Sequence, residues 1–336
     1  MRAAVFHGHG VLNVEDWPEP SLRAPDDVLI EVEACGICGS DLQIINLPPG
    51  HPSTPPVVLG HEFVGRVAAL GPAASVAGLA VGQRVVVDPD PKCGVCSFCR
   101  TGRPANCENI VALGVHRDGG LARFVVAPAG AVYRISDTVP TVIAALVEPL
   151  ACVVNGANRA NARPGESAVV FGAGAIGCLF VTLFKAAGAG PVIAVEPTEG
   201  RRAVAAAVGA DLVFSPDEFI ARSREVLPGG AEILVDAVGT QLPTAIEHAA
   251  LGGRIILFGQ NANARPPVHQ YTITERSLTI MGTYITNYTF PAAIRLVEQG
   301  TLPLALIVTH VLPLERLAEG IELLRSGTAT KVVITP

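Results

Sequence analysis

The amino-acid sequence predicts an α/β protein of two domains, a β-rich, barrel-like domain followed by one built on a doubly wound parallel sheet. The length of 336 residues exceeds the roughly 250–300 residues at which a single core usually stops growing. Up to residue 152, short valine-rich segments are divided by glycine and proline, which is typical of a barrel-like β domain. Beyond Arg163-Pro164-Gly165, apolar strands alternate with helical stretches, as in a parallel sheet covered by helices.

The individual elements follow from hydrophobic periodicity and from turn residues. In the first domain, strands are expected at residues 28–34, 57–70, 83–88 and 121–127. In the second, strands are expected at 168–171, 192–196, 233–238 and 254–259, and helices at 175–187, 200–208 and 244–250. Helices at 291–299 and 314–326 and a final strand at 331–335 are expected to return to the first domain. The predicted boundaries are therefore 1–152, 153–285 and 286–336.

Composition limits the classes of partner. Hydrophobic residues make up 49% of the chain, and the net charge of −6 gives no electrostatic reason to expect nucleic acid or an anionic membrane. The start, Met1–Val5, reads as a strand rather than a signal peptide, and the longest apolar run, 174–184, is too short to span a bilayer. We expect a cytoplasmic protein that acts on a small molecule.

A glycine-rich turn marks a dinucleotide site. The strand that ends at Phe171 leads into Gly172-Ala173-Gly174-Ala175-Ile176-Gly177 and then into a helix. This G-x-G-x-x-G pattern has the flanking strand and helix that it requires. Gly172 makes the turn, Gly174 lets the backbone approach a pyrophosphate, and Gly177 lets the helix pack on the sheet. Free N–H groups at the helix start favour the anionic pyrophosphate.

The next strand predicts the cofactor. It ends at Glu196, where a carboxylate can accept hydrogen bonds from ribose hydroxyls and repel a 2′-phosphate, so NAD is favoured over NADP. Arg201 and Arg202 leave NADP open, since a nearby arginine can bind the 2′-phosphate.

Four cysteines predict a structural metal site. Cys93, Cys96, Cys99 and Cys107 have the spacing of a four-thiolate zinc shell, within a lobe that spans residues 90–108. A shell of four thiolates has no open position, so its role would be structural. The remaining cysteines have different surroundings. Cys35 reads as a core residue that continues the strand 28–34, and Cys152 and Cys178 read as small buried hydrophobes.

Three dispersed segments carry further metal-ligating types. They are Gly36-Ile-Cys38-Gly-Ser40-Asp41, Gly60-His61-Glu62 and Glu148-Pro-Leu150. Alone, each is ordinary. Together with Cys93–Cys107, Arg117-Asp-Gly-Gly120 and Gly172–Gly177, in this order and spacing, they resemble the medium-chain zinc-dependent alcohol dehydrogenase family, above all its polyol and threonine dehydrogenase branch. The resemblance covers essentially the whole chain.

The resemblance implies a GroES-like catalytic domain, an inserted Rossmann domain and an active site between the two. It implies that Cys38 and His61 bind a catalytic zinc together with Glu148 or Glu62, either of which can serve as the carboxylate ligand. Asp41 would orient His61. The chain would thus bind two zinc ions.

The resemblance also implies hydride transfer between a secondary alcohol and the nicotinamide, with zinc lowering the pKa of the substrate hydroxyl. Ser40 matches the hydroxyl that relays the alcohol proton. Gln43 departs from the pattern, because that position is often a histidine that completes the relay, and glutamine does not titrate near neutrality.

The substrate is less defined. The predicted pocket consists of Ser40, Gln43, His116, Tyr284 and Thr286, whereas for His51 and His116 a solvated loop position is the simpler interpretation. Ile285 and Thr286 stand where sorbitol dehydrogenases usually have Arg then Tyr, so sorbitol is not favoured. A polyol, cyclitol, aminocyclitol, sugar or threonine-like amino alcohol fits equally well. A homo-oligomer, dimer or tetramer, is expected from the family.

Two other functions are compatible with parts of the sequence. An NADP-linked reductase of ketones or aldehydes fits the same motifs. A non-catalytic binding protein on this fold would have lost the Cys38, His61 and Glu148 set and would carry a basic surface around the cysteines. The set is intact, and the cysteine-rich loop has only three basic residues, Lys92, Arg100 and Arg103.

Overall fold

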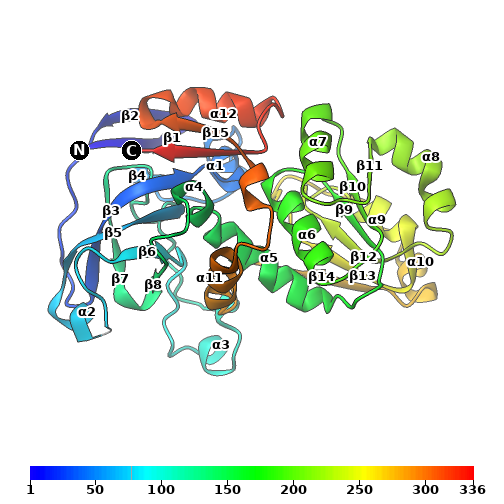
Figure 1. Ribbon diagram of the computed structural model, residues 1–336, viewed down its shortest axis with the longest axis horizontal. Coiled ribbons are helices and arrows are strands. Elements are labelled where there is room, and N and C mark those ends of the chain that lie inside the picture. The colour runs from blue at the N-terminus through cyan, green and yellow to red at the C-terminus, as the bar shows by residue number, and fades with distance from the viewer. Residues whose placement is uncertain (77) are drawn as a thin grey trace.

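The computed structural model describes residues 1–76 and 78–336. It has two lobes, a β-rich lobe that holds both termini and an α/β lobe (Figure 1). The long helix α5 (Val147–Ala160) lies between them and packs against α6 and α11. Apart from that helix, each lobe is organised around its own sheet.

The β-rich lobe is built on a mixed sheet in the order β15-β16-β3-β5-β6-β8, with β7 also paired to β3. Its strands are β3 (Asp27–Gly36), β5 (Glu62–Leu70), β6 (Arg84–Val87), β7 (Phe124–Pro128), β8 (Val132–Arg134), β15 (Val308–Pro313) and β16 (Lys331–Thr335). The antiparallel pairing of β16 with β3 returns the end of the chain to this lobe. Cys35 lies in β3 and is fully buried.

Shorter elements close this lobe. A second sheet has the order β2-β1-β4. The remaining elements are β1 (Arg2–Gly8), β2 (Val11–Asp16), β4 (Val57–Val58), α1 (Gly39–Ile45), α2 (Pro72–Val76), α3 (Ser97–Arg100), α4 (Thr141–Ala144) and α12 (Leu317–Arg325), with 3-10 turns η1 (Pro104–Asn106), η2 (Ala129–Ala131), η3 (Leu304–Leu306) and η4 (Leu314–Arg316). The single strand expected at 57–70 is divided at Gly60, which turns the chain between β4 and β5.

The α/β lobe holds a parallel sheet in the order β11-β10-β9-β12-β13-β14. The first strand of this lobe is therefore central, and the strand order reverses beside it, as in a Rossmann fold. The strands are β9 (Ala168–Phe171), β10 (Val192–Val195), β11 (Leu212–Phe214), β12 (Ala231–Asp236), β13 (Ala249–Leu257) and β14 (Thr279–Gly282). The predicted fold class, a GroES-like domain plus a Rossmann domain, is confirmed.

Helices cover both faces of this sheet (Figure 1). They are α6 (Ala175–Ala186), α7 (Glu199–Ala207), α8 (Pro216–Val226), α9 (Leu242–His248) and α10 (Gln270–Glu275), and α11 (Phe290–Gln299) packs on α5. Helix α8 was not expected, although its start carries a capping box in which Ser215 accepts from the N–H of Glu218 and Glu218 accepts from the N–H of Ser215.

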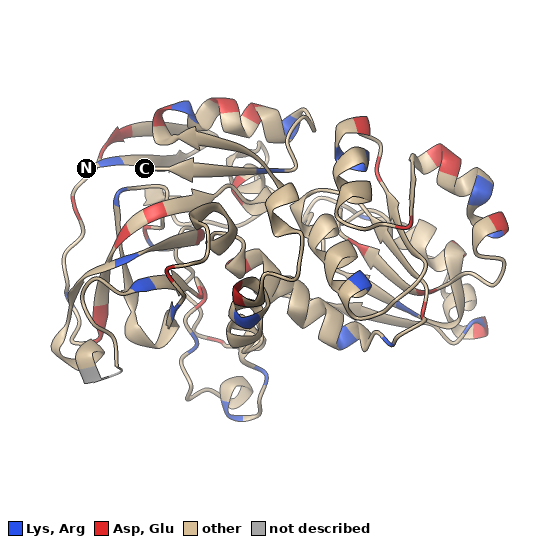
Figure 2. Ribbon diagram, viewed as in Figure 1, with Lys and Arg blue, Asp and Glu red and all other residues tan. Residues whose placement is uncertain are grey.

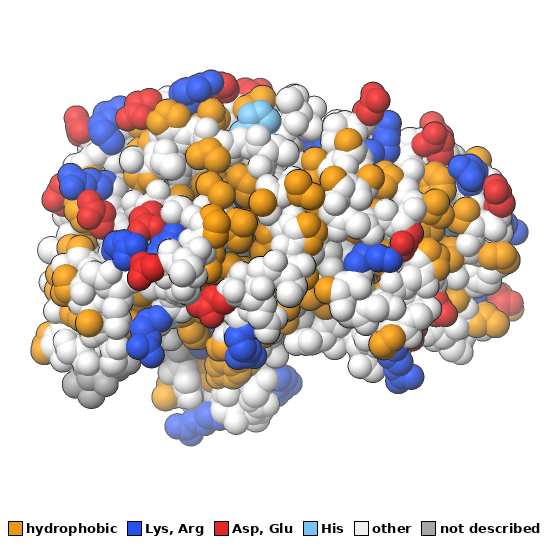
Figure 3. Space-filling view, in the orientation of Figure 1, with side chains coloured by type: hydrophobic (Ala, Val, Ile, Leu, Met, Phe, Trp, Pro, Cys, Tyr) orange, Lys and Arg blue, Asp and Glu red, His pale blue; other side chains and the backbone are white. Residues whose placement is uncertain are grey.

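The surface shows no segregation of charge in this view. Basic and acidic side chains alternate along helices such as α8 and α12 (Figure 2). Hydrophobic side chains gather near the middle of this face, over the region of α4 and α11 (Figure 3). Among the described residues, no helix is both long and apolar enough to cross a bilayer.

Candidate active site

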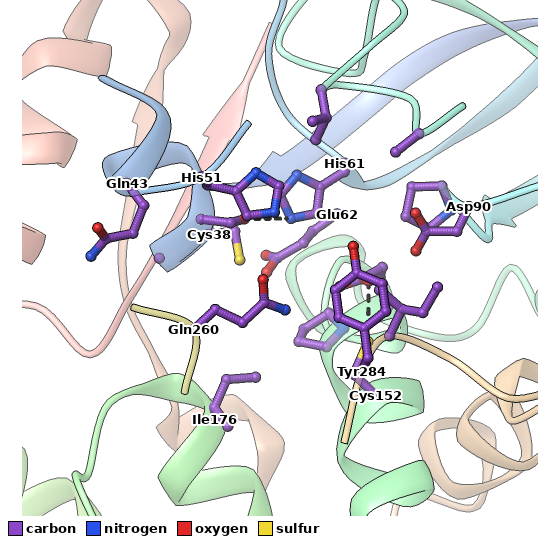
Figure 4. Close-up of a pocket in the computed structure, with 18 of the residues that line it drawn as sticks. Cys38, Gln43, His51, His61, Glu62, Asp90, Cys152, Ile176, Gln260 and Tyr284 are labelled. Carbon is purple, nitrogen blue, oxygen red and sulfur yellow. Dashed lines mark hydrogen bonds between the residues drawn. The ribbon is translucent and has the colours of Figure 1, made fainter. Parts of the chain in front are cut away.

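A cavity of about 290 Å³ opens between the two lobes. Its walls come from α1 and the loops around it, the start of β5, the segment before the cysteine-rich lobe, the start of α5, and the carboxyl ends of β12, β13 and β14. In open α/β sheets, ligands bind outside the carboxyl ends of the strands. This cavity therefore has the Rossmann sheet on one side and the dispersed metal-ligating residues on the other (Figure 4).

Three candidate metal ligands meet on the wall of this cavity. The ligand atoms of Cys38, His61 and Glu62 all lie within 4.8 Å of one another. The register of the sheet causes this meeting, because β3 and β5 pair with Gly36 opposite Glu62. Cys38 lies two residues after the end of β3, and His61 directly precedes β5, so the pairing brings the two segments together. A Cβ at Gly60 would lie 2.7 Å from the Cys35 sulfur and 2.9 Å from the Leu121 nitrogen, so only glycine fits this turn.

The two ring nitrogens of His61 have different neighbours. Its Nδ1 faces the Asp41 carboxylate at 3.6 Å, and its Nε2 lies 3.3 Å from the Ser40 hydroxyl. Asp41 also accepts a hydrogen bond from the Cys38 N–H at 2.9 Å. An acid behind Nδ1 leaves the Nε2 lone pair for a metal, which is the usual arrangement behind metal-bound imidazole. Together with one thiolate and one carboxylate, this donor set fits zinc.

The two candidate glutamates have different partners. Glu62 is 1% exposed and forms a buried ion pair with Lys331 of β16, whose ammonium also donates to the Ile37 carbonyl at 2.9 Å. Glu148 lies on α5 outside the close group of three, and accepts a hydrogen bond from the Cys152 thiol at 3.4 Å. Burial raises the pKa of Glu148 to about 8 in the absence of metal.

The glycine-rich turn connects β9 to α6. Gly172 has φ +91°, and a Cβ at Gly177 would lie 1.8 Å from the Gly172 carbonyl oxygen, so the helix packs on the turn only with glycine there. A Cβ at Gly174 would meet no atom within 4 Å. Gly174 is the N-cap of α6, and Ile176 in its first turn lines the cavity. Open space at a helix N-terminus is where a pyrophosphate would bind.

Glu196 lies at the end of β10, beside this turn. It is 4% exposed, and its carboxylate accepts hydrogen bonds from the N–H groups of Ala173 at 2.8 Å and Thr198 at 3.0 Å. Arg201, expected near the cofactor, instead donates to the carbonyls of Leu324 and Ala329 and so ties α7 to the end of α12. Arg201 was expected near the cofactor from its distance along the chain, and its guanidinium is held by carbonyls of the other lobe.

The cysteine-rich lobe gathers its four sulfurs. The Sγ atoms of the four cysteines lie within 4.8 Å of one another, with Cys93 and Cys99 4.0 Å apart. Zn–S bonds of about 2.3 Å place tetrahedral sulfurs roughly 3.8 Å apart, so the cluster fits a four-thiolate zinc shell. The Asn109 amide donates to the Cys93 sulfur at 3.4 Å and is the main cause that lowers the pKa of Cys93 to about 6. A thiol with such a pKa is readily available as a thiolate ligand.

The structure separates the predicted substrate residues. Gln43, His116 and Tyr284 line the cavity, and so does His51, for which a solvated loop position was expected. Thr286 does not line the cavity. It is fully buried and donates to the Asp88 carboxylate at 2.9 Å. The departure from the expected position follows from the backbone, since Ile285 adopts φ +43° and turns the chain just before Thr286.

Several residues that line the cavity were not predicted from the sequence. Asp90 contributes a carboxylate, and Val238, Phe258 and Gln260 contribute the Rossmann side of the wall. Val238, Phe258 and Gln260 could have been identified from the sequence, because they lie just beyond the carboxyl ends of the parallel strands β12 and β13. Asp90 had only a weak signal, a carboxylate between two prolines before the first cysteine of the lobe.

A dinucleotide-type turn facing a Cys/His/Glu cluster across one cavity is the arrangement of a zinc-dependent, nicotinamide-linked dehydrogenase. Comparison with known proteins agrees. Residues 24–137 match the family model of the alcohol dehydrogenase GroES-like domain, and residues 175–299 match that of the zinc-binding dehydrogenases. The chain belongs to the medium-chain zinc-dependent alcohol dehydrogenase family, in its polyol and threonine dehydrogenase branch.

Individual relatives support this assignment. The D-altritol 5-dehydrogenase of Agrobacterium fabrum is 36% identical over 325 residues, which cover 94% of each chain. The L-threonine 3-dehydrogenase of Caldanaerobacter subterraneus is 34% identical over 327 residues, covering 93% of this chain and 92% of that protein. The structure of a zinc-binding dehydrogenase of Sinorhizobium meliloti, solved with bound NADP, superimposes on this one with a TM-score of 0.93 at 31% sequence identity. The superposition covers 100% of this chain and 99% of that chain. The chain is thus an oxidoreductase of alcohols.

Proposed function

We propose that the chain oxidises a secondary alcohol of the polyol or amino-alcohol type with NAD, and that it uses one catalytic and one structural zinc ion. The observation that carries this proposal is the close group of Cys38, His61 and Glu62 on a cavity whose opposite wall is the Rossmann sheet. A zinc ion there would supply a Lewis acid that lowers the pKa of a substrate hydroxyl, and NAD would accept the hydride.

The remaining groups of the site would position and deprotonate the substrate. Cys38 and His61 would hold the metal with Glu62 or Glu148, and Asp41 would fix the orientation of the His61 ring. The Ser40 hydroxyl lies 3.3 Å from His61 Nε2 and could take a proton from a substrate hydroxyl held beside that nitrogen.

The preference for NAD rests on Glu196. Its buried carboxylate lies beside the glycine-rich turn, where a 2′-phosphate would meet a like charge. Arg201 is bound to carbonyls of the other lobe, and Arg202 donates to the carbonyls of Glu196 and Pro197 at 2.9 and 2.6 Å. Affinities for NADH and NADPH in Glu196→Ala and Glu196→Gln test this. We expect both variants to gain NADPH affinity relative to NADH. An unchanged ratio would contradict the assignment.

The experiment that tests the function as a whole measures NADH formation from a panel of polyols, cyclitols, aminocyclitols and L-threonine, before and after zinc is removed by a chelator. We expect chelation to abolish turnover and added zinc to restore it. Turnover that survives with less than one zinc per chain would exclude a catalytic zinc. The branch includes threonine dehydrogenases, so L-threonine is the second candidate substrate.

A further inference from the structure

Among the described residues, the walls of the active-site cavity carry three carboxylates and three histidines but no lysine or arginine. Glu62, Asp90 and Glu148 line it, and within residues 1–76 and 78–336 neither lysine nor arginine does. Glu62 is already neutralised by its ion pair with Lys331, which lies behind the wall. A phosphate or carboxylate on a substrate would therefore meet no lysine or arginine on the described walls, whereas groups that donate hydrogen bonds would find acceptors.

Asp90 is the acceptor without a partner. Its residue is 7% exposed, and in the described part of the chain no hydrogen bond or ion pair reaches its carboxylate. Lys92 donates instead to the Asp90 backbone carbonyl and pairs with Asp88 at 3.5 Å. Asp88 also accepts from Thr286 and from the Asp90 N–H, so the neighbouring acid is satisfied while Asp90 is not. Its oxygens are not among the fully buried polar atoms that lack a partner, so they remain accessible from the cavity that Asp90 lines, where a substrate group can reach them.

The direction of the Asp90 side chain also indicates that its carboxylate is available to a substrate. Figure 4 shows it on the side of Cys38 and Glu62 opposite to Gln43, with its carboxylate at the cavity and the Tyr284 ring nearby. Burial is the main cause that raises the pKa of Tyr284, and the Asp90 charge raises it further, which agrees with two groups facing one space. A substrate held at the Cys/His/Glu group would extend between Gln43 and Asp90.

We propose that Asp90 accepts a hydrogen bond from a hydroxyl or ammonium group of the substrate, on a carbon other than the one oxidised, so that the enzyme selects neutral or cationic alcohols with several donor groups and disfavours anionic ones. This specificity role rests on the proposed dehydrogenase function. Among the candidate substrates, this role of Asp90 favours polyols, cyclitols and aminocyclitols over alcohols that carry a carboxylate or phosphate.

Four small alcohols test the proposal: 2-butanol, 2,3-butanediol, 3-amino-2-butanol and 3-hydroxybutyrate. 2-Butanol carries no second polar group, whereas the other three carry, in the order named, a second hydroxyl, an ammonium and a carboxylate. In the zinc-loaded wild type, we expect kcat/KM with NAD to be highest for the diol or the amino alcohol and lowest for 3-hydroxybutyrate. In Asp90→Ala, the ratio of kcat/KM for the preferred substrate to that for 2-butanol should fall by about 10- to 100-fold, the usual effect of losing a hydrogen bond to a charged group.

Asp90→Asn distinguishes the two donors. The amide keeps an acceptor oxygen but lacks the charge, so the ratio for the amino alcohol should fall further than the ratio for the diol. Asp137→Asn, at an exposed carboxylate paired with Arg66, is the matched control and should leave both ratios unchanged. Equal loss for all four alcohols in Asp90→Ala, or 3-hydroxybutyrate as the best wild-type substrate, would overturn the proposal.

A binding measurement keeps this test independent of turnover. The four alcohols should raise the Tm of the enzyme–NADH complex in the order given for kcat/KM, and the Asp90→Ala variant should lose the difference between 2-butanol and the donor-bearing alcohols. Equal Tm shifts in wild type and variant would refute the role of Asp90. Failure of the dehydrogenase function itself would appear differently, as wild-type protein that retains its zinc but forms no NADH with any alcohol of the larger panel.

Discussion

The Lys331 ammonium donates to the Glu62 carboxylate beneath the candidate metal site, although 269 positions separate the two residues. Both side chains are 2% exposed. Burial disfavours the charged form of Lys331, but the Glu62 carboxylate and other acids outweigh it and raise the pKa of Lys331 above its usual value. The pair joins the last strand of the chain to the strand that carries a metal ligand, so the end of the sequence supports the active site directly.

Removal of this lysine should be costly. Lys331→Met leaves a buried carboxylate without its partner, and we expect the free energy of unfolding to fall by about 3–5 kcal/mol in chemical denaturation. The double variant Lys331→Met/Glu62→Gln should recover much of that loss, because the orphaned charge is gone. Lys185→Met is the control. It breaks a half-exposed pair with Asp211 and should cost only about 0–1 kcal/mol. Equal losses in the two single variants would contradict a stabilising buried pair.

The glycines of the cofactor turn should separate folding from binding. In Gly177→Ala, the added Cβ would collide with the Gly172 carbonyl oxygen at 1.8 Å, so both Tm and NADH affinity should fall. In Gly174→Ala, the Cβ meets no protein atom within 4 Å, so Tm should be maintained while NADH affinity, measured by fluorescence titration, falls at least about 10-fold. If Gly174→Ala bound NADH as wild type does, the pyrophosphate would not lie at this turn.

The cysteine-rich lobe should hold a zinc ion that is independent of catalysis. In Cys96→Ser, we expect bound zinc, measured by elemental analysis, to fall from about two ions per chain to about one, and Tm to fall with it. The remaining activity per catalytic zinc should be close to that of wild type. Cys178→Ser, a buried thiol outside both clusters, should keep both ions. A protein that holds only one zinc before any substitution would contradict one of the two sites.

Local sequence patterns predicted much of the fold. The strand 168–171 and the final strand 331–335 begin and end where expected, and the expected helix 175–187 ends one residue earlier in the structure. These segments have strong periodicity and clear turn residues on either side. The four-cysteine cluster was equally predictable, because its members are close in the chain as well as in space.

Contacts between distant segments were not predictable in this way. Lys331 is the first residue of the expected final strand, and only the pairing of β16 with β3 places it beneath Glu62. The hydrogen bonds of Arg201 and Thr286 could not be predicted for the same reason, since their partners lie 123 and 198 positions away. Polar side chains take the buried partners that tertiary packing offers, and sequence spacing does not encode that choice.

His51 raises a final question about the path of the proton. Gln43 cannot titrate, but His51 lies on the same cavity, and the Gly50 N–H donates to the Gln43 carbonyl at 2.9 Å, which ties the loop of His51 to α1. His51 Nδ1 lies 2.8 Å from the Pro52 carbonyl oxygen. A carbonyl oxygen only accepts, so Nδ1 carries the proton and Nε2 is free to receive one. The imidazole is thus arranged as a base.

We therefore expect His51→Gln to lower kcat/KM for alcohol oxidation by about 100-fold at neutral pH. Burial lowers the pKa of His51 below its usual 6.5, so the neutral base is present at neutral pH and is lost only as pH falls through that lowered pKa. The acid limb of the wild-type pH–rate profile should consequently disappear or shift in His51→Gln. Adding Gln43→His to the His51→Gln variant should restore an acid limb of the pH–rate profile, because it places an imidazole on α1. His269→Gln, at an exposed histidine, is the control. An identical acid limb in wild type and His51→Gln would mean that the proton leaves by another route, such as the ribose hydroxyls and water.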